Sequence, residues 1–261
     1  MADLPKEKQV AFTNPAGERL AGTLHLPARP AARALAMGHC FTCSRHTRIL
    51  SDICRGMSRA GFLALRFDFS GNGQSEGDFA ASSYSKHMDE MRSAVEFLRR
   101  EGCDWIGLAG HSMGAAIALL TAARHQGVKA LCTLAGRYSG LNVRGLLDRL
   151  QARELADQGR VTFVSRGRAL ALHHTFFEDA DRQDPAAALR NAACPILAVH
   201  GDMDEIIPVA EARHAAATRP DSVATAIIPG ADHMFSRAEH REAVTALVTA
   251  WFLKQAPPEA G

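Results

Sequence analysis

Short runs of consecutive apolar residues alternate along the chain with longer segments in which apolar residues recur every three or four positions. The runs are typical of strands buried on both faces, and the longer segments are typical of amphipathic helices. The predicted strands are Ala34–Met37, Phe62–Phe67, Trp105–Ala109, Val128–Leu134, Ile196–Val199 and Ala224–Ile228. The predicted helices lie near Thr47–Arg59, Tyr84–Arg100, Met113–His125, Val209–Thr218 and Glu239–Leu253. This alternation predicts an α/β fold with a mostly parallel sheet covered by helices on both faces.

The N-terminal segment follows a different pattern. Two short strands are predicted at Gln9–Thr13 and Leu20–Leu26, and the turn residues Asn14-Pro15-Ala16-Gly17 join them. A turn this short can connect only antiparallel strands. We therefore expect an antiparallel hairpin at the opening of the sheet.

The interval from Gly136 to Arg190 contains no strand that fits the main sheet. An amphipathic helix is indicated by four apolar residues at helical spacing, namely Val143, Leu146, Leu147 and Leu150. Arg160–Leu172 resembles a small hairpin that turns at Arg166-Gly167. We expect a cap insertion over approximately residues 137–190, within a single domain that spans residues 1–261.

The strongest chemical signal is a G-x-S-x-G pattern, Gly110-His111-Ser112-Met113-Gly114. The predicted strand Trp105–Ala109 precedes it, and small residues with helical spacing follow it. In a strand–turn–helix of this kind the tight turn projects the serine hydroxyl above the sheet, and glycines allow the backbone to approach closely. The pattern predicts that Ser112 is a nucleophile at the N-terminal end of a helix.

A serine hydroxyl needs a base to remove its proton and a third group to orient that base. Two later segments place polar residues just after predicted strands. His200-Gly-Asp-Met-Asp-Glu-Ile-Ile-Pro208 follows the strand Ile196–Val199, and Pro229-Gly-Ala-Asp-His-Met-Phe235 follows Ala224–Ile228. Open α/β sheets place their sites at this edge. Asp202 and Asp204 are the competing acids, and His233 is the candidate base.

Together, GHSMG, HGDMDEIIP and PGADHMF resemble the three catalytic segments of the α/β-hydrolase superfamily. The resemblance implies an α/β-hydrolase fold with a sheet of about eight strands flanked by helices. It also implies Ser112 as nucleophile, Asp204 rather than Asp202 as acid, and His233 as base. It extends over roughly Leu20–Phe252 and is weakest over the insertion.

Two further segments narrow the resemblance. The runs HCFTCSR, beginning at His39, and RFDFSGNGQSEGDFA, beginning at Arg66, resemble feruloyl and cinnamoyl esterase-like hydrolases. They resemble still more the hydrolase domains that occur alone or joined to an osmotically-inducible-protein-C-like domain. The resemblance implies an oxyanion hole formed by the backbone N–H groups of Met113 and Phe41, although Cys40 stands where many relatives have glycine. We expect no catalytic role for four other histidines. His111 is expected only to lie in the turn beside the nucleophile, His200 only to end a strand, and His173 and His174 only to lie on the surface.

Cys40-Phe-Thr-Cys43 has a C-x-x-C spacing that a redox pair or half of a zinc site could use. No second C-x-x-C completes a zinc site, and the six cysteines are scattered through the chain. We therefore expect two reduced thiols in a loop. A disulfide there would constrain the turn that holds the Phe41 N–H and would alter kcat more than KM.

Composition excludes several classes of function. The net charge is only +2, so nothing indicates nucleic acid as a partner. No apolar stretch is long enough to span a membrane, and charged residues near the N-terminus do not fit a secretion signal. We expect a cytoplasmic enzyme that needs no cofactor and no metal. The sequence does not indicate its oligomeric state.

The predicted activity is hydrolysis of carboxylic esters of small molecules, through an acyl-enzyme on Ser112. A thioesterase or a serine peptidase would use the same three residues, and a ligand-binding protein with slow turnover would retain them. The expected cap contains seven arginines and three acids between Arg137 and Arg168. This excess of positive charge is typical of a surface exposed to solvent. The alternative is a cavity entrance that attracts substrates carrying a carboxylate.

Overall fold

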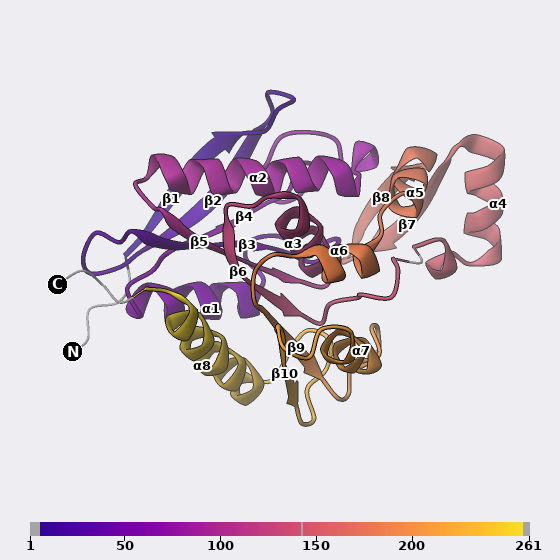
Figure 1. The fold of residues 1–261 in the computed structure, drawn as a ribbon. Coiled ribbons are helices and arrows are strands. Elements are labelled where there is room, and N and C mark those ends of the chain that lie inside the picture. The colour runs from indigo at the N-terminus through magenta and orange to yellow at the C-terminus, as the bar shows by residue number, and fades with distance from the viewer. Residues whose placement is uncertain (1–5, 142, 258–261) are drawn as a thin grey trace.

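The computed structural model describes residues 6–141 and 143–257. The two ends of the expected 1–261 domain and the first residues of the charged N-terminus lie outside these ranges. The described strands form an eight-stranded sheet and a separate two-stranded sheet. In Figure 1 the large sheet crosses the middle of the molecule and the small sheet lies at one end.

The large sheet has the strand order β1-β2-β4-β3-β5-β6-β9-β10. β2 pairs with β1 and β4 in antiparallel register, and all other neighbours are parallel. The strands are β1 (Lys6–Thr13), β2 (Arg19–Leu26), β3 (Arg33–Gly38), β4 (Leu63–Phe67), β5 (Trp105–His111), β6 (Val128–Leu134), β9 (Ile196–Gly201) and β10 (Val223–Ile228). The predicted opening hairpin and mostly parallel sheet are confirmed.

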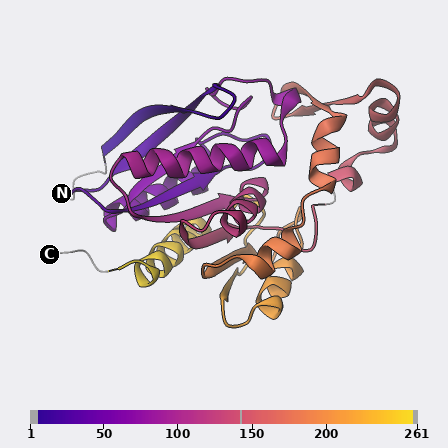
Figure 2. The same ribbon diagram turned by 45° about the horizontal axis from the view of Figure 1, so that its top comes forward.

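Helices cover both faces of this sheet (Figures 1 and 2). α1 and α8 pack together on one face, while α2 and α3 lie on the other, where α6 and α7 continue the layer toward β10. The helices are α1 (Arg48–Arg59), α2 (Tyr84–Arg100), α3 (Met113–Arg124), α4 (Arg149–Gln158), α5 (His174–Asp181), α6 (Pro185–Asn191), α7 (Ala210–Thr218) and α8 (Ala238–Gln255). Two 3₁₀ turns lie at Phe79–Ala81 and Val143–Leu146.

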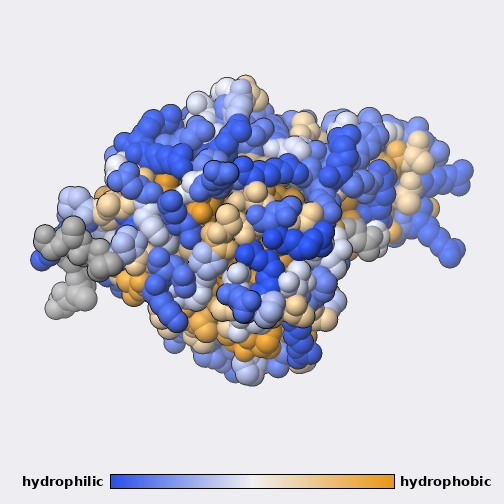
Figure 3. Space-filling model, viewed as in Figure 1, coloured by the Kyte–Doolittle hydropathy of each residue, from blue (hydrophilic) through white to orange (hydrophobic). Residues whose placement is uncertain are grey.

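The two faces of the sheet belong to two apolar cores. Successive side chains of a strand point to opposite faces. In β3, Leu35 and Met37 therefore belong to the core under α1 and α8, whereas Ala34 and Ala36 belong to the core under α2 and α3. Figure 3 shows that hydrophilic side chains cover most of the face seen in Figure 1. The apolar strands are thus buried on both sides, as their continuous runs predict.

The segment between β6 and β9 contains α4, α5, α6 and the small sheet. Its strands β7 (Arg160–Ser165) and β8 (Arg168–His173) pair antiparallel around the turn at Arg166-Gly167, which confirms the predicted hairpin. β8 lies against the 3₁₀ turn Phe79–Ala81, and α5 packs on α2. The segment therefore sits beside the carboxyl ends of the central strands.

The prediction of one amphipathic helix through Val143 and Leu150 is wrong. The Val143–Leu146 turn ends, and α4 begins separately after Asp148, whose side chain accepts the Gln151 N–H at 2.8 Å. A capping aspartate favours a new helix start because it satisfies an amide that lacks a partner within the helix. Leu146 and Leu150 are 71% and 80% exposed, so they do not form a buried face.

Candidate active site

Ser112 lies on a sharp turn between β5 and α3. Its backbone has φ 56° and ψ −115°, a conformation that costs free energy for any residue with a side chain. Its N–H donates to the Leu134 carbonyl of neighbouring β6 at 2.9 Å, which holds the turn against the sheet. The surrounding fold thus maintains a strained serine at the carboxyl edge of the central strands.

The two glycines of the pattern are required by close backbone contacts. A Cβ at Gly110 would lie 2.0 Å from the Gly114 carbonyl oxygen, and one at Gly114 would lie 2.4 Å from the Gly38 carbonyl oxygen. Neither neighbour can move easily, because both are backbone atoms. Gly114 therefore allows the serine turn to pack directly against the loop that follows β3.

His233 and Asp204 lie at the ends of adjacent strands. The His233 Nδ1 is 2.8 Å from Oδ2 and 3.0 Å from Oδ1 of Asp204. A carboxylate can only accept, so Nδ1 carries the hydrogen and Nε2 is left as a proton acceptor. His233 and Ser112 line the same cavity. The structure thus brings together the three residues that the sequence singles out.

Asp204 is surrounded by hydrogen-bond donors. Its Oδ1 accepts the N–H groups of Ile206 at 2.9 Å and Ile207 at 2.8 Å, and the His200 Nε2 lies 3.2 Å from Oδ2. Burial raises the pKa of this carboxyl, but the hydrogen bonds from His200, His233 and Ile207 outweigh burial and lower the pKa well below its ordinary value. Asp204 is therefore ionised across the physiological pH range.

Asp202, the competing acid, has a different partner. Its Oδ1 accepts the Gly230 N–H at 2.6 Å and so joins the loop after β9 to the loop after β10. The side chain is exposed. Asp202 thus supports the loop that carries His233, whereas the imidazole ring is hydrogen-bonded to Asp204.

Two further histidines contact His233 and Asp204, although no sequence pattern pointed to them. His111 is fully buried, and its Nε2–H donates to the His233 carbonyl oxygen at 2.8 Å. Burial and the neighbouring His233 lower the pKa of His111 to about 3, so its ring is neutral. His200 shares its Nε2–H between the Ile207 carbonyl, at 2.8 Å, and Asp204. His173 and His174 are exposed, as expected.

The loop after β3 contains the second predicted oxyanion donor, Phe41. Phe41 and Met113 line the cavity together with Ser112. Cys40 and Cys43 form a disulfide across Phe41 and Thr42, so the expectation of two reduced thiols is wrong. The other four cysteines are free and buried. Spacing alone did not reveal the bond, because it requires the loop to bring two Cα atoms within 5.3 Å.

Buried polar groups support this loop from below. The His39 Nδ1–H donates to the Cys40 carbonyl at 2.7 Å, and its Nε2 accepts the Phe69 N–H at 3.0 Å. Burial lowers the pKa of His39 to about 4, which keeps one ring nitrogen as an acceptor. Asp68 accepts the Arg45 N–H at 2.6 Å and also pairs with the Arg45 guanidinium. The loop is therefore anchored at both ends.

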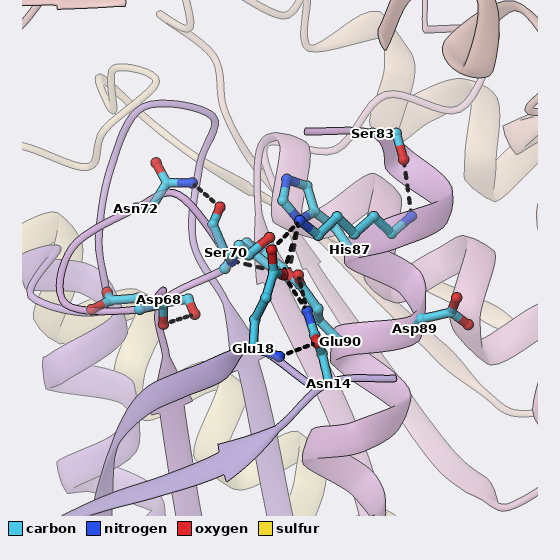
Figure 4. Close-up of polar contacts among 12 residues, drawn as sticks. Asn14, Glu18, Asp68, Ser70, Asn72, Ser83, His87, Asp89 and Glu90 are labelled. Atoms are coloured by element: carbon cyan, nitrogen blue, oxygen red, sulfur yellow. Dashed lines mark hydrogen bonds and ion pairs between the residues drawn. The ribbon is translucent and has the colours of Figure 1, made fainter. Parts of the chain in front are cut away.

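A second buried network continues beneath the loop after β4. Figure 4 shows Asn14, Ser70 and His87 gathered around the Glu90 carboxylate. Glu90 accepts from the Asn14 amide at 3.1 Å, the Ser70 N–H at 3.1 Å and His87 Nδ1 at 2.9 Å. These bonds connect the turn after β1, α2 and the loop after β4. The loop after β4 in turn donates the Phe69 N–H to His39, which precedes the Phe41 turn.

Comparisons with known proteins agree with this fold. The family profile described as serine aminopeptidase, S33, matches residues 43–144, and the profile of the prolyl oligopeptidase family matches residues 155–258. An esterase domain of a Rhodothermus marinus protein superposes with TM-score 0.74 at 27% identity, covering 95% of this chain and 98% of that one. The chain belongs to the α/β-hydrolase superfamily.

Other solved structures share the fold at lower identity. Est1E from Butyrivibrio proteoclasticus, solved with ferulic acid bound, gives TM-score 0.80 at 23% identity and covers 94% of this chain and 98% of that one. The Pyrococcus furiosus esterase Pf2001 gives TM-score 0.73 at 16% identity, with 96% and 93% covered. No curated protein matches the chain. The α/β-hydrolase fold predicted from the sequence is confirmed.

In this α/β-hydrolase the cavity beside Ser112 has a volume of about 400 Å³. One wall is aromatic: the Phe41 ring lies 5.9 Å from that of Phe163 and 5.6 Å from that of Phe176. Phe163 and Phe176 come from the segment between β6 and β9, as does Leu141. That segment therefore forms one side of the cavity. Its role as a cap stays a prediction.

Two observations bear on other expectations. Within residues 6–141 and 143–257, no three His, Cys, Asp or Glu side chains gather so as to hold a metal ion. None of the helices in the same ranges is long and apolar enough to cross a membrane. The absence of a metal and of a cofactor remains a prediction for this α/β-hydrolase.

Proposed function

We propose that the protein hydrolyses small carboxylic esters through an acyl-enzyme formed on Ser112. The proposal rests on the arrangement of three side chains at one cavity. A strained serine and a histidine that is hydrogen-bonded to a carboxylate line one cavity, at the sheet edge where parallel strands end. Serine needs such a base in order to act as a nucleophile.

Acylation begins when the Ser112 hydroxyl attacks the ester carbonyl and the His233 Nε2 takes its proton. Asp204 stays ionised, keeps the hydrogen on Nδ1 and stabilises the imidazolium. The backbone N–H groups of Phe41 and Met113 donate to the oxyanion that develops on the carbonyl oxygen. His233 then gives its proton to the leaving alcohol, and the acyl group remains on Ser112.

Deacylation repeats these steps with water. His233 takes a proton from water as the water oxygen attacks the acyl-enzyme. His233 then returns that proton to the Ser112 oxygen as the bond to the acyl group breaks, which releases the acid and restores the serine hydroxyl. No metal or cofactor takes part in this sequence. We also infer that residues 137–190 act as a cap on one domain, since their side chains form one side of the cavity.

The similar structures favour ester substrates. The Rhodothermus marinus relative is an esterase domain, and Est1E was solved with ferulic acid, a small aromatic acid. Phe41, Phe163 and Phe176 could stack on an aromatic acyl group of that size. Esters of hydroxycinnamic acids are therefore the first aromatic substrates to test.

A peptidase is the second candidate, because both matching family profiles describe peptidases. The two activities differ in the leaving group and not in the acyl-enzyme. An amide leaving group must be protonated by His233 before it can depart, so amides are cleaved more slowly unless the site is shaped for them. Direct comparison of substrates separates the two candidates.

The test has two parts. A fluorophosphonate probe should label wild type at Ser112 and should not label Ser112→Ala, which shows whether the serine is activated. Then kcat/KM is measured for an ester, a thioester and an amide of one acyl group. The proposal expects the ester to be cleaved fastest. A preference for the amide supports the peptidase, and labelling with negligible turnover of all three indicates a binding protein.

A further inference from the structure

The cavity beside Ser112 contains positive charge and no negative charge. Arg137 and Arg166 are among its lining residues, whereas no aspartate or glutamate of the described ranges lines it. Most of the remaining wall is apolar, which weakens the screening of charge by water. A cavity of this composition favours an anionic ligand.

Arg137 is half-buried, and no described residue, within 6–141 or 143–257, contacts its guanidinium through a hydrogen bond or ion pair. Arg45 and Arg66 are buried more deeply, and each is paired, Arg45 with Asp68 and Arg66 with Glu7 at 3.3 Å. Taking a cation out of water without a partner costs free energy. At the cavity wall, a substrate can supply the missing anion.

The acids that act on this part of the cavity already bind other groups. Glu211 interacts electrostatically with Arg137 but accepts the N–H groups of Tyr138 at 2.7 Å and Ser139 at 2.9 Å. Asp179 accepts the Ser85 N–H at 2.9 Å. The Glu211 bonds also fix the backbone directly after Arg137, so the arginine is held in place without being neutralised by contact.

The chain keeps Arg137 close to the nucleophile. Arg137 lies three residues after Leu134, whose carbonyl oxygen accepts the Ser112 N–H. Three residues extend over at most about 10 Å between Cα atoms. Arg137 and Ser112 both line the cavity. Tyr84 also lines it. Burial raises the pKa of Tyr84, so its hydroxyl stays protonated and can donate to an anion.

We infer that Arg137 is a specificity-determining residue that binds a carboxylate of the substrate, so that esters carrying a free carboxylate near the scissile carbonyl are preferred. The inference rests on the proposed function, because it uses the same nucleophile and cavity. A guanidinium presents two parallel N–H donors that match a carboxylate. Arg166 also lines the cavity, but it is exposed at the hairpin turn, where water screens its charge more strongly than that of half-buried Arg137.

The substrates for the test are pairs of equal chain length. Monomethyl succinate, glutarate and adipate are compared with methyl butyrate, valerate and hexanoate, which places the carboxylate on the acyl side at three distances. 4-Acetoxybutyrate is compared with butyl acetate, which places it on the alcohol side. The preference is the ratio of kcat/KM for the charged ester to that for its uncharged partner.

Wild type is expected to prefer at least one charged ester by about tenfold or more, as a charge-assisted bidentate hydrogen bond implies. Arg137→Gln is expected to lower that ratio about tenfold. Arg153→Gln is the matched control, because Arg153 is 82% exposed and pairs with Asp157 on α4. It should leave the ratio unchanged. A ratio in Arg137→Gln within twofold of wild type overturns the inference, as does a wild-type preference for every uncharged ester.

Binding separates this inference from the proposed function. Glutarate is titrated calorimetrically into Ser112→Ala and into Ser112→Ala/Arg137→Gln. Glutarate binding to Ser112→Ala that disappears in Ser112→Ala/Arg137→Gln supports the carboxylate site, whether or not any ester is hydrolysed. If such binding is seen but no ester is hydrolysed, only the proposed hydrolysis fails. Equal binding to both variants, or none to either together with no preference in turnover, overturns the carboxylate site.

Discussion

Asp202 and Asp204 lie two positions apart after the same strand, yet their carboxylates bind different groups. Asp204 is hydrogen-bonded to the His233 ring, while Asp202 accepts the Gly230 N–H. The difference arises from the direction of each side chain in the loop after β9. A serine–histidine pair depends on the carboxylate that selects the histidine tautomer.

We predict that Asp204→Asn lowers kcat by about four orders of magnitude, because an asparagine amide can stabilise the tautomer that cannot accept the Ser112 proton. Asp202→Asn should lower kcat far less, since an amide oxygen can still accept the Gly230 N–H. Steady-state kinetics on one ester measures both. If Asp202→Asn is the more damaging change, the acid has been assigned to the wrong aspartate.

The proposed catalytic residues could be picked out because each lies in a short recognisable segment. Ser112, Asp204 and His233 are examples, although only the resemblance favoured Asp204 over Asp202. His111, His200 and Arg137 could not be predicted in the same way. Their significance depends on what faces them from distant parts of the chain, such as the His233 carbonyl 122 positions after His111.

At the scale of elements, the loop between β3 and α1 holds Phe41, one of the two proposed oxyanion donors. The Cys40–Cys43 disulfide closes the four-residue turn that contains Phe41, and His39 binds the Cys40 carbonyl. An oxyanion hole stabilises the transition state because its donors are held in place before the reaction. Loosening this turn should therefore reduce the rate of the chemical step more than substrate binding.

We predict that reduction of the disulfide lowers kcat by up to about a hundredfold and changes KM little. Complete loss of one oxyanion donor lowers kcat by about a hundredfold or more, and reduction only loosens the turn that holds the donor. The measurement is kcat for wild type and Cys43→Ser in reducing and mildly oxidising buffer. Wild type should be faster when oxidised, and Cys43→Ser should respond to neither buffer. The same response in both proteins would contradict the prediction.

The strands of the main sheet could be predicted with little error in their bounds, because most of them are local runs of apolar residues. In the segment between β6 and β9 the β7–β8 hairpin could be predicted, but the helices could not. There α4 starts at the Asp148 cap and α6 starts at Asp184 with Pro185 in its first turn. These capping signals are present in the sequence, but the apolar spacing around Leu146 and Leu150 favours a different helix.

At the scale of the whole molecule, several histidines are buried without charge. Burial lowers the pKa of His111 to about 3 and those of His25 and His39 to about 4, from an ordinary value of 6.5. In the unfolded chain these rings take up protons as the pH falls below 6.5, whereas in the folded protein they do not. Acid therefore stabilises the unfolded state.

We predict that the free energy of unfolding falls as the pH is lowered from 7 to 5, by up to about 1.4 kcal/mol per pH unit for each such histidine. Asp204 and Glu90, whose pKa values are lowered, contribute only at more acid pH. Urea unfolding at several pH values measures the slope, and His111→Gln should reduce it. An unchanged slope in His111→Gln would show that this ring titrates normally.

The central claim is that Ser112 and His233 act as one catalytic unit, and double-variant kinetics test it most directly. kcat/KM on a single ester is measured for Ser112→Ala, His233→Ala and the combined variant, with urea unfolding to confirm that each is folded. We predict that each single change lowers kcat/KM by about four to six orders of magnitude and that the combined variant is within a few-fold of either. Losses that multiply in the combined variant would show that the two residues act independently and would contradict the account.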